Sequence, residues 1–511
     1  MKKTAGLVMG LFLMVAFGLP PLAAGSGEKT YMDVDKVRTR LDELLPRCQE
    51  VFEVPGMAVG LLKDGKVIYS KALGVRRLGS DRQMTTRSLF HMASVSKPFV
   101  ATAVMQLVEK GKIKLGGKLV EYLPYFRLED ERYKDITIGQ MLNHTSGLPD
   151  VRDYEWDKPQ YDDGAAERYI RSLVKEKMIA APAERFRYSN MAFDILADVI
   201  ARASGMTFEQ YMKENIFKPL AMKDSTFLKK EVPDELANNA HVLKDRIAFE
   251  IGVSEVYPYN RAHAPSSTLH SNVEDMMRWG MANLNHGELA GKRILKPQTH
   301  ARLWQPTVPA FGDTFVGIGW FLGNYKGEKV VAHGGGDVGF RTYFLMVPER
   351  KLAVVTMGNS DSYDSQAVVN VVLDVVLGHE PEMPKKPAVV PMGRTLVKEG
   401  IKAAVQLYRR LKKEQPQGYD FSEAALNRYG YGLLRAKRHE EAIEIFSLNA
   451  AEYPESWNVY DSLAEAYLEK GDKDNALKCY RKAYAKNPQK RDFEVRAGQN
   501  QKKIIDELTQ K

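Results

Sequence analysis

The sequence predicts an α+β fold built on an antiparallel sheet flanked by helices, with an inserted helical region and a second, all-α domain behind it. Three observations support this division. Strand-like segments gather at both ends of the first 380 residues while helical segments lie between them, and this segregation is typical of α+β domains. A proline-rich stretch follows at 381–397. Beyond it, small and aromatic positions recur every 34 residues, which indicates a helical repeat.

The first 25 residues have the features of a secretory signal peptide. Lys2 and Lys3 precede an apolar run over 5–19, and small residues at 23–25 offer a cleavage site. The run is shorter than the ~20 residues that a membrane-spanning helix needs. We therefore expect an exported protein, periplasmic or extracellular, that meets the membrane only through this peptide before cleavage. An uncleaved anchor is the alternative.

Composition argues against several classes of function. The formal net charge is +9, but basic residues alternate with acidic ones, so no nucleic-acid partner is expected. No metal or organic cofactor is expected either, because the sequence has no His-Glu-x-x-His motif and no clustered Cys and His ligands. Its two cysteines, Cys48 and Cys479, are far apart. We expect them to be free or buried thiols, with a disulfide as the lesser alternative.

The first domain is expected to begin with a helix and two strands. Residues 33–51 carry apolar side chains at helical spacing. Residues 57–62 and 66–73 are apolar runs on either side of Asp64-Gly65, a dipeptide typical of tight hairpin turns. These two strands are expected to pair with each other.

Strand signals return late in this domain, after a region of helices and loops. They occupy 314–322, 329–332, 338–347 and 351–357, and the last three are consistent with an antiparallel meander. The sheet is therefore expected to contain strands from both ends of the domain, with the helical region inserted between them.

The candidate reactive residue is Ser94, which opens an apolar helix. Lys97 follows three residues later, and this spacing places both side chains on one helix face, within reach of each other. Free amides and the positive end of the helix dipole favour negative charge near such a serine. Ser-x-x-Lys is a weak pattern that also occurs at Ser26 and Ser172. Those serines lie beside the expected cleavage site and among charged residues, so Ser94 is favoured.

Two later motifs strengthen this assignment. Tyr188 and Asn190 form the one Tyr-x-Asn of the sequence, at the entry to a predicted helix over 191–203. His333 precedes three glycines, 334–336, on or beside a late strand, where glycine allows close approach of the backbone to a ligand. Each motif alone has an ordinary structural explanation, as a half-buried tyrosine or a loop histidine. Their order along the chain makes coincidence a poor explanation.

With these motifs the chain resembles the serine β-lactamase and penicillin-binding-protein superfamily, in its class C-like branch. The resemblance covers roughly 33–380 and includes Asn-His-Thr-Ser-Gly-Leu at 143–148 and Gly-Ile-Gly-Trp at 317–320. It implies a β-lactamase/transpeptidase-like fold and hydrolysis through an acyl-enzyme, without a cofactor. The branch contains β-lactamases, carboxypeptidases, D-amino-acid peptidases and esterases, so it constrains the chemistry better than the substrate.

The resemblance implies a catalytic role for three residues. Ser94 is the expected nucleophile, Lys97 its base, and Tyr188 a partner of Lys97 in proton transfer. A serine hydroxyl is a weak nucleophile until a base takes its proton. Lys97 must therefore be partly neutral, and burial can lower its pKa from the usual ~10.4 far enough.

The resemblance also implies a substrate-binding group of Asn190, His333, Gly335 and Gly336. Asn190 is expected to orient the substrate, and the backbone amides of Ser94 and Gly336 to hold the oxyanion. True β-lactamases and carboxypeptidases generally carry Lys-Thr-Gly where this chain has His333, and that lysine and threonine help to bind a carboxylate. Esterase-like and aminopeptidase-like relatives carry histidine there. A neutral imidazole, with a usual pKa of ~6.5, offers a carboxylate less.

This departure favours an ester or a D-amino-acid-containing amide or peptide as the small-molecule substrate. β-Lactamase or D-Ala-D-Ala carboxypeptidase activity is the alternative. A further alternative is a non-catalytic, penicillin-recognising scaffold that acts through its repeats. The presence of Ser94, Lys97, Tyr188 and Asn190 together favours an enzyme.

The expected domain boundaries follow from the linker. A hydrolase domain over 26–380 precedes the linker at 381–397, and a helical domain fills 398–511. Within the latter, 423–456 and 457–490 resemble two tetratricopeptide repeats. Two repeats need flanking support to be stable. Binding of a protein or peptide partner is the predicted role of the repeats, and a structural brace is the alternative.

Overall fold

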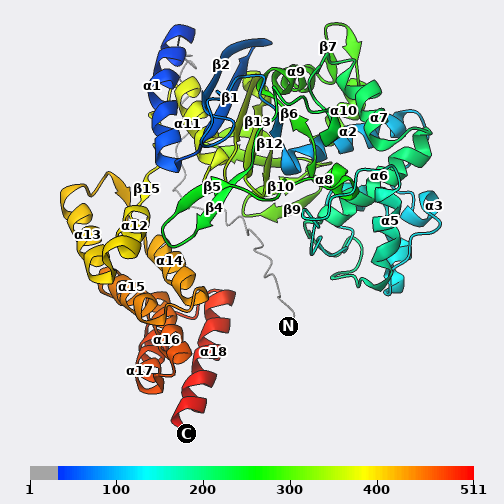
Figure 1. Ribbon diagram of the computed structural model, residues 1–511. Helices are drawn as coiled ribbons and strands as arrows, with labels where there is room; N and C mark the ends of the chain where they lie inside the picture. The colour runs from blue at the N-terminus through cyan, green and yellow to red at the C-terminus, as the bar shows by residue number, and fades with distance from the viewer. Residues whose placement is uncertain (1–32, 511) are drawn as a thin grey trace. The chain divides into compact units, whose positions relative to one another are not determined.

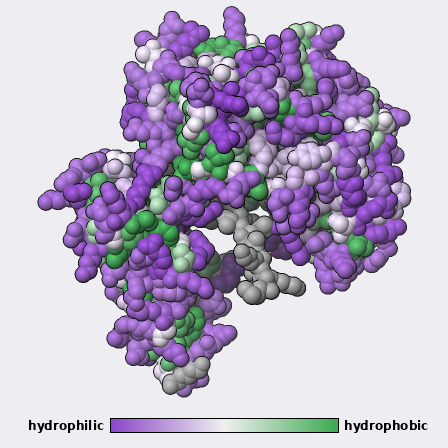
Figure 2. Space-filling model, viewed as in Figure 1, coloured by the Kyte–Doolittle hydropathy of each residue, from purple (hydrophilic) through white to green (hydrophobic). Residues whose placement is uncertain are grey.

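The computed structural model describes residues 33–510, which form two compact units (Figure 1). The first takes in the described chain up to Val242 together with Val253–Met383, and the second takes in Leu243–Gly252 and the chain from Pro384 onward. The predicted signal peptide, 1–25, lies outside the described residues. Among the residues that are described, no helix is long and apolar enough to cross a membrane. Hydrophilic residues cover most of the face in Figure 2, with hydrophobic residues in smaller patches.

An eight-stranded sheet forms the centre of the first unit, in the order β2-β1-β14-β13-β12-β11-β10-β9. The strands are β1 (Gly56–Lys63), β2 (Lys66–Gly74), β9 (Val308–Phe311), β10 (Thr314–Val316), β11 (Phe321–Tyr325), β12 (Glu328–Asp337), β13 (Phe340–Val347) and β14 (Leu352–Gly358). β1 pairs antiparallel with both β2 and β14, so the two ends of the unit meet in one sheet. The predicted α+β fold class is confirmed.

Helices cover both faces of the sheet (Figure 1). Helices α1 (Val34–Phe52) and α11 (Ser365–Leu377) share an apolar core with one face. Helices α2 (Ser96–Glu109), α6 (Asn190–Ser204) and α9 (Val273–Leu284) share the core of the other face. Strand β1 shows why both faces are apolar. Val59 and Leu61 belong to the core that contains α1 and α11, whereas Ala58 and Leu62 belong to the core on the other face of the sheet. Successive side chains of a strand point to opposite faces of the sheet, so β1 is apolar on both.

Short elements complete the inserted helical region of this unit. They are β3 (Phe90–His91), α3 (Leu119–Tyr122), α4 (Ile138–Leu142), α5 (Ala165–Ser172), α7 (Phe208–Met212), α8 (Ala264–Ser267), β6 (His270–Ser271), β7 (Glu288–Leu289), β8 (Lys292–Arg293) and α10 (Pro297–Leu303). β3 pairs with β6 rather than with the central sheet. This small ladder leads directly into the turn that carries Ser94.

The strand predicted over 314–322 is two strands. A turn at 317–320 separates β10 from β11, and the Gly317 amide donates to the Trp320 carbonyl at 2.8 Å. Gly319 has φ +72°, and a side chain on it would lie 2.5 Å from the Ala101 methyl group. Glycine thus allows a turn in contact with α2. Because the residues around it are apolar, the sequence has the pattern of one continuous strand.

The second unit contains the C-terminal helices and a hairpin from earlier in the chain. It contains most of β4 (His241–Asp245) and of β5 (Glu250–Val253), whose outer ends belong to the first unit. Its other elements are β15 (Lys386–Pro387), α12 (Val389–Glu399), α13 (Ile401–Glu414), β16 (Tyr419–Asp420), α14 (Glu423–Arg435), α15 (His439–Glu452), α16 (Trp457–Lys470), α17 (Lys473–Lys486) and α18 (Asp492–Thr509). Helices α14 and α15 occupy the first predicted repeat, and α16 and α17 the second. That these are tetratricopeptide repeats stays a prediction.

The linker expected over 381–397 is only partly a linker, because α12 begins at Val389. Pro391 lies in the first turn of this helix, where a missing amide hydrogen breaks no intrahelical bond. The hairpin tip, 243–252, was not expected in this unit. Ile247 belongs to its core, and the Phe249 and Tyr429 rings stack with centroids 5.5 Å apart. Cys48 of the first unit and Cys479 of the second are free thiols.

Candidate active site

Ser94 lies in a tight turn at the edge of the buried core. The α-helix itself begins at Ser96, and Ser94 is in the 3₁₀ turn Ala93–Val95 before it, not on the first helical turn as expected. Ala93 has φ +48°, a strained value for a residue with a side chain. Ser96 stabilises the turn, because its hydroxyl donates to the Ala93 carbonyl at 2.7 Å and accepts from the Leu269 amide at 3.1 Å.

Lys97 is fully buried and touches Ser94. Its Nζ donates to Ser94 Oγ at 2.9 Å, to Asn190 Oδ1 at 2.5 Å and to the Ser266 carbonyl at 2.7 Å. The three acceptors match the three hydrogens of an ammonium group. Two of these partners come from α6 and α8, so the insertion of helices into the sheet domain completes the surroundings of Lys97.

Tyr188 approaches Ser94 from a second direction. Its hydroxyl donates to Ser94 Oγ at 3.0 Å, and its ring stacks on His144 with centroids 4.3 Å apart. The neighbouring Ser189 is the N-cap of α6 and accepts from the Ala192 amide, while its own amide donates to His144 Nδ1 at 3.2 Å. Helix capping and ring stacking together orient the tyrosine toward the serine.

Asn190 has both ends of its side-chain amide engaged. Nδ2 donates to Asp150 Oδ1 at 3.0 Å, while Oδ1 accepts from Lys97. Asp150 also accepts from the Asn190 backbone amide at 2.8 Å. A carboxylate can only accept, so Asp150 determines that the oxygen of Asn190 faces Lys97.

The Ser266 carbonyl is held in place by a buried hydrogen-bond network. Its own amide donates to Asp194 Oδ1 at 3.2 Å, and Asp194 Oδ2 lies 2.7 Å from His263 Nδ1. All three residues are buried. This network supports one acceptor of Lys97 without touching Ser94.

Burial shifts the pKa values of Lys97 and Tyr188, the two side chains that contact Ser94, in opposite directions. It lowers the pKa of Lys97 to about 8, against the opposing effect of the carboxylates of Asp194, Asp150 and Asp337. Burial raises the pKa of Tyr188, and the hydrogen bond to Ser94 only partly offsets this. Near neutral pH, Lys97 can therefore lose a proton far more easily than Tyr188 can.

His333 is buried beside these residues and is neutral. Burial and the nearby charge of Lys97 lower its pKa to about 3. Its Nδ1 lies 2.7 Å from the Gly334 carbonyl, while Nε2 has no hydrogen-bond partner within the described part of the chain. Its ring centroid is 6.5 Å from that of Tyr188.

The glycines after His333 bring β12 against the serine turn. A side chain on Gly335 would lie 2.3 Å from the Met92 carbonyl oxygen and 3.1 Å from the Ser94 amide nitrogen. Thr342, opposite Gly335 on β13, donates its hydroxyl to the same Met92 carbonyl at 2.8 Å. A side chain on Gly336 would meet Arg341 instead, at 3.3 Å. The structure thus brings Ser94, Lys97, Tyr188, Asn190, His333 and Gly335 to one place.

A family model described as Beta-lactamase matches 41–376, which is more than half of the chain. The chain belongs to the beta-lactamase family. This family agrees with the resemblance of the sequence to the β-lactamase and penicillin-binding-protein superfamily.

Curated relatives and a solved structure agree with this family. Protein flp of Staphylococcus aureus strain MW2 is 25% identical over 328 residues, which cover 63% of each protein. Penicillin-binding protein 4* of Bacillus subtilis strain 168 is 26% identical over 346 residues, covering 63% of this chain and 73% of that protein. The octameric penicillin-binding protein homologue from Pyrococcus abyssi is 26% identical with a TM-score of 0.60, covering 72% of this chain and 82% of its own. The chain therefore spans less than two thirds of the length of flp.

Several residues of this beta-lactamase family site escaped sequence analysis. Asp150, Asp194 and Ser266 contact the Lys97 environment, but each is 40 or more positions from the residue it orients. The sequence did contain a signal for His144 as a site residue, because it lies in the segment 143–148 that resembles the family. A third carboxylate, Asp337, lies just after the glycines and accepts from His91 Nε2 at 2.8 Å and from the Ser267 hydroxyl.

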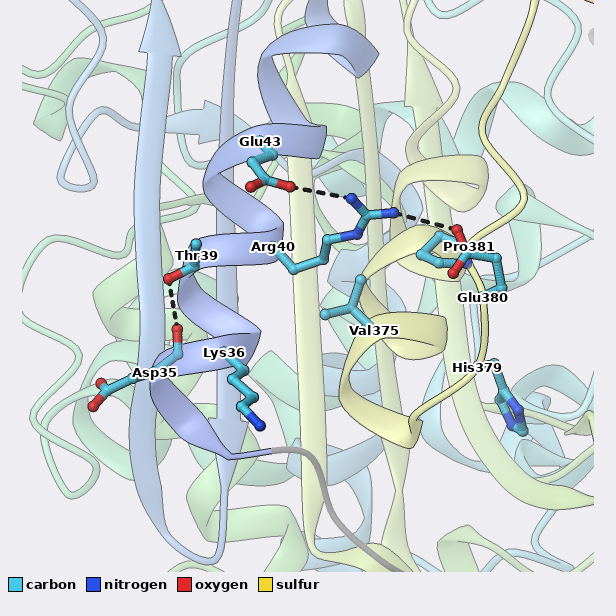
Figure 3. Close-up of a pocket in the computed structure, with 9 residues that line it drawn as sticks. All are labelled: Asp35, Lys36, Thr39, Arg40, Glu43, Val375, His379, Glu380 and Pro381. Atoms are coloured by element: carbon cyan, nitrogen blue, oxygen red, sulfur yellow. Dashed lines mark hydrogen bonds and ion pairs between the residues drawn. The ribbon is translucent and has the colours of Figure 1, made fainter.

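An open cavity between α1 and α11 is separate from the site around Ser94 (Figure 3). Both helices pack on the face of the sheet opposite to α2. In this cavity Arg40 bridges Glu43 and Glu380, at 3.1 and 3.2 Å (Figure 3). Across 33–510, no group of three or more His, Cys, Asp or Glu side chains is placed to hold a metal ion.

Proposed function

We propose that the protein is an exported serine hydrolase that forms an acyl-enzyme on Ser94. Its expected substrate is an ester or a D-amino-acid-containing amide or peptide. The observation that carries this proposal is the fully buried Lys97, hydrogen-bonded to Ser94 and with a pKa lowered to about 8. A lysine of that pKa is a competent base near neutral pH.

Acylation begins with proton transfer from Ser94 Oγ to the neutral Nζ of Lys97. The serine oxygen then bonds to the substrate carbonyl carbon, and the carbonyl oxygen becomes an oxyanion. The backbone amides of Ser94 and Gly336 stabilise it in this proposal, and one such donor contributes about 3 kcal/mol elsewhere. When the bond to the leaving group breaks, Tyr188 gives that group its phenol proton and regains one from Lys97.

Deacylation repeats these steps with water. Lys97 accepts a proton from the attacking water, either directly or through Tyr188, whose phenol gives its own proton to Lys97 as it takes one from the water. The new tetrahedral intermediate then expels Ser94 Oγ, which takes the proton back. The raised pKa of Tyr188 supports a phenol that relays protons rather than a resting phenolate. Asn190 acts in this scheme by orienting Lys97, since its amide is already held by Asp150.

Because His333 is neutral, it supports an uncharged ester or amide as the substrate rather than a substrate that is bound through a carboxylate group. The names of relatives favour the second candidate, a penicillin-recognising enzyme, because the Bacillus and Pyrococcus proteins are called penicillin-binding proteins or their homologues.

The predicted signal peptide supports export, and the paired helices α14–α15 and α16–α17 support a peptide-binding role for the second unit.

Hydrolysis of p-nitrophenyl acetate and of a chromogenic cephalosporin distinguishes the two candidates. We expect ester turnover that Ser94→Ala abolishes, together with slow or undetectable cephalosporin turnover. Fast, Ser94-dependent cephalosporin turnover would establish the second candidate instead. No turnover of either substrate, and no labelling of Ser94 by a fluorophosphonate, would favour a binding protein.

A further inference from the structure

A continuous series of aromatic rings leads from Ser94 to the protein surface. Tyr188, whose hydroxyl contacts Ser94, has its ring centroid 6.3 Å from that of Phe321. Phe321 lies 6.2 Å from Phe311 and 6.3 Å from Phe186. Phe186 and Phe311 are 5.1 Å apart, edge to face. We call Phe186, Phe311 and Phe321 the aromatic strip.

The outer end of the strip is open to solvent. Phe311 is 46% exposed, while Phe186 and Phe321 are half-buried. The inner end meets the polar groups of the site, since Phe321 is 5.1 Å from the ring of His333, whose Nε2 lacks a hydrogen-bond partner among the described residues. The strip is therefore an apolar path that leads through Tyr188 to Ser94. An apolar group lying on it would cover ring surface that is now exposed to solvent.

The strip begins on the side from which the leaving group receives its proton. Tyr188 supplies that proton in the proposed reaction, so the leaving atom must lie within hydrogen-bond reach of its hydroxyl. A group attached to that atom would pass over the Tyr188 ring toward Phe321. Neither the rings of the strip nor the neutral His333 offers a charge to bind a carboxylate.

Resting on the proposed hydrolase function, we propose that the aromatic strip binds the leaving group of the substrate, and that this group is apolar and aromatic. The substrate class is then an aryl or arylalkyl ester or amide. The rings of the strip lie at centroid distances of 5.1 to 6.3 Å in edge-to-face or tilted arrangements, and a further ring can join such a cluster.

The hairpin of β9 and β10 offers a matched control for the test. Phe315 is 40% exposed, close to the 46% of Phe311, but it makes no ring contact with another aromatic residue in the described chain. Replacement of either residue by alanine removes a similar exposed surface. Only Phe311→Ala shortens the aromatic strip.

The experiment compares kcat/KM for phenyl acetate and 2-naphthyl acetate, which share the acyl group and differ in the apolar surface of the leaving group. We expect the wild-type protein to prefer the naphthyl ester. Phe311→Ala should reduce that preference roughly 5- to 10-fold, as the loss of a modest apolar contact does. Phe311→Leu should retain most of it, and Phe315→Ala all of it.

Equal preferences in Phe311→Ala and Phe315→Ala would overturn the leaving-group assignment. A loss confined to longer acyl chains, measured with p-nitrophenyl acetate and hexanoate, would also overturn it by placing the acyl group on the strip. Failure of the underlying hydrolase proposal looks different, because both acetates would then be hydrolysed equally well by Ser94→Ala and the wild-type protein, or by neither.

Discussion

In each of the two units a glycine allows a close contact, but the two contacts have different roles. In the first unit, a methyl group on Gly335 would lie 2.3 Å from the Met92 carbonyl, in the backbone that carries Ser94. In the second, a methyl group on Gly430 of α14 would lie 2.5 Å from Phe446 of α15. The first contact positions a reactive group, whereas the second packs two helices.

The units also differ in what they bury. The first unit buries the amine of Lys97, and Ala93 and His144 beside it have positive φ values of 48° and 59°. The contact between α14 and α15 is made by residues such as Leu433 and Phe446, which are apolar. Burial of an ionisable group and backbone strain both reduce stability, and at Ser94 they accompany the proposed reactive group. Substitutions in the two units should therefore separate activity from stability.

Lys97→Met should have the largest effect on activity. The variant lacks the base, so kcat/KM for an ester should fall by about 10³-fold, within the usual range for general-base catalysis. Thermal stability should not fall with it, because an apolar side chain replaces a buried amine whose charged form is disfavoured. The matched control is Lys175→Met, in the Ser-x-x-Lys at 172–175, whose serine and lysine are exposed, and it should leave kcat/KM unchanged. Ester kinetics and thermal melts would show this, and a Lys97 variant within tenfold of wild type would exclude Lys97 as the base.

Gly335→Ala should reduce kcat/KM by about 10²-fold. The added methyl group would push β12 away from the Met92 carbonyl, and a displacement of about 1 Å at a reactive group has effects of this size. Gly336→Ala should be milder, because its methyl group would meet the flexible side chain of Arg341 at 3.3 Å. Ester kinetics on both variants test the comparison. A larger loss of kcat/KM in Gly336→Ala than in Gly335→Ala would contradict the prediction, because a methyl group would then be tolerated less well at position 336.

Asp150→Asn should reduce kcat/KM by about tenfold and move its pH dependence. The neutral form of Lys97 is the active base, so kcat/KM of the wild type should rise with pH up to about 8 and then level off. The Asp150 carboxylate raises the pKa of Lys97, so its removal should shift this rise to lower pH. Asp337→Asn should shift the rise in the same direction and less, since Asp337 is the smallest of the three contributors. A rise that moves to higher pH in Asp150→Asn would contradict this electrostatic account.

Gly430→Ala should leave kcat/KM within twofold of wild type while it destabilises the second unit. The methyl group would overlap the Phe446 ring, and overpacking of a core costs about 1–3 kcal/mol. Gly432→Ala on the same helix has open space within 4 Å, so it should stabilise the unit by roughly 0.5–1 kcal/mol. Urea unfolding of both variants would reveal opposite shifts. Equal shifts would mean that the α14–α15 contact does not limit the stability of this unit.

Local signals account for the parts of the molecule that sequence analysis predicted well. The β1–β2 hairpin depends on Asp64-Gly65, and both residues adopt the positive φ that such a turn needs. The short spacing of Ser94 and Lys97 brings their side chains together even though the turn is 3₁₀ rather than α-helical. The break between β10 and β11 was missed, because apolar residues continue through the turn at 317–320.

The sequence by itself predicted that strands from both ends of the first domain share one sheet with helices inserted between them, and it identified the candidate residues Ser94, Lys97, Tyr188 and Asn190. These features depend on periodicity and short spacing, which a linear sequence records. Only the tertiary structure revealed the role of Asp150 in orienting Asn190, the acceptor at Ser266, and the inclusion of 243–252 in the second unit. It also decided the acidity of Lys97, because desolvation depends on every segment that packs around a group, and those segments come from distant parts of the chain.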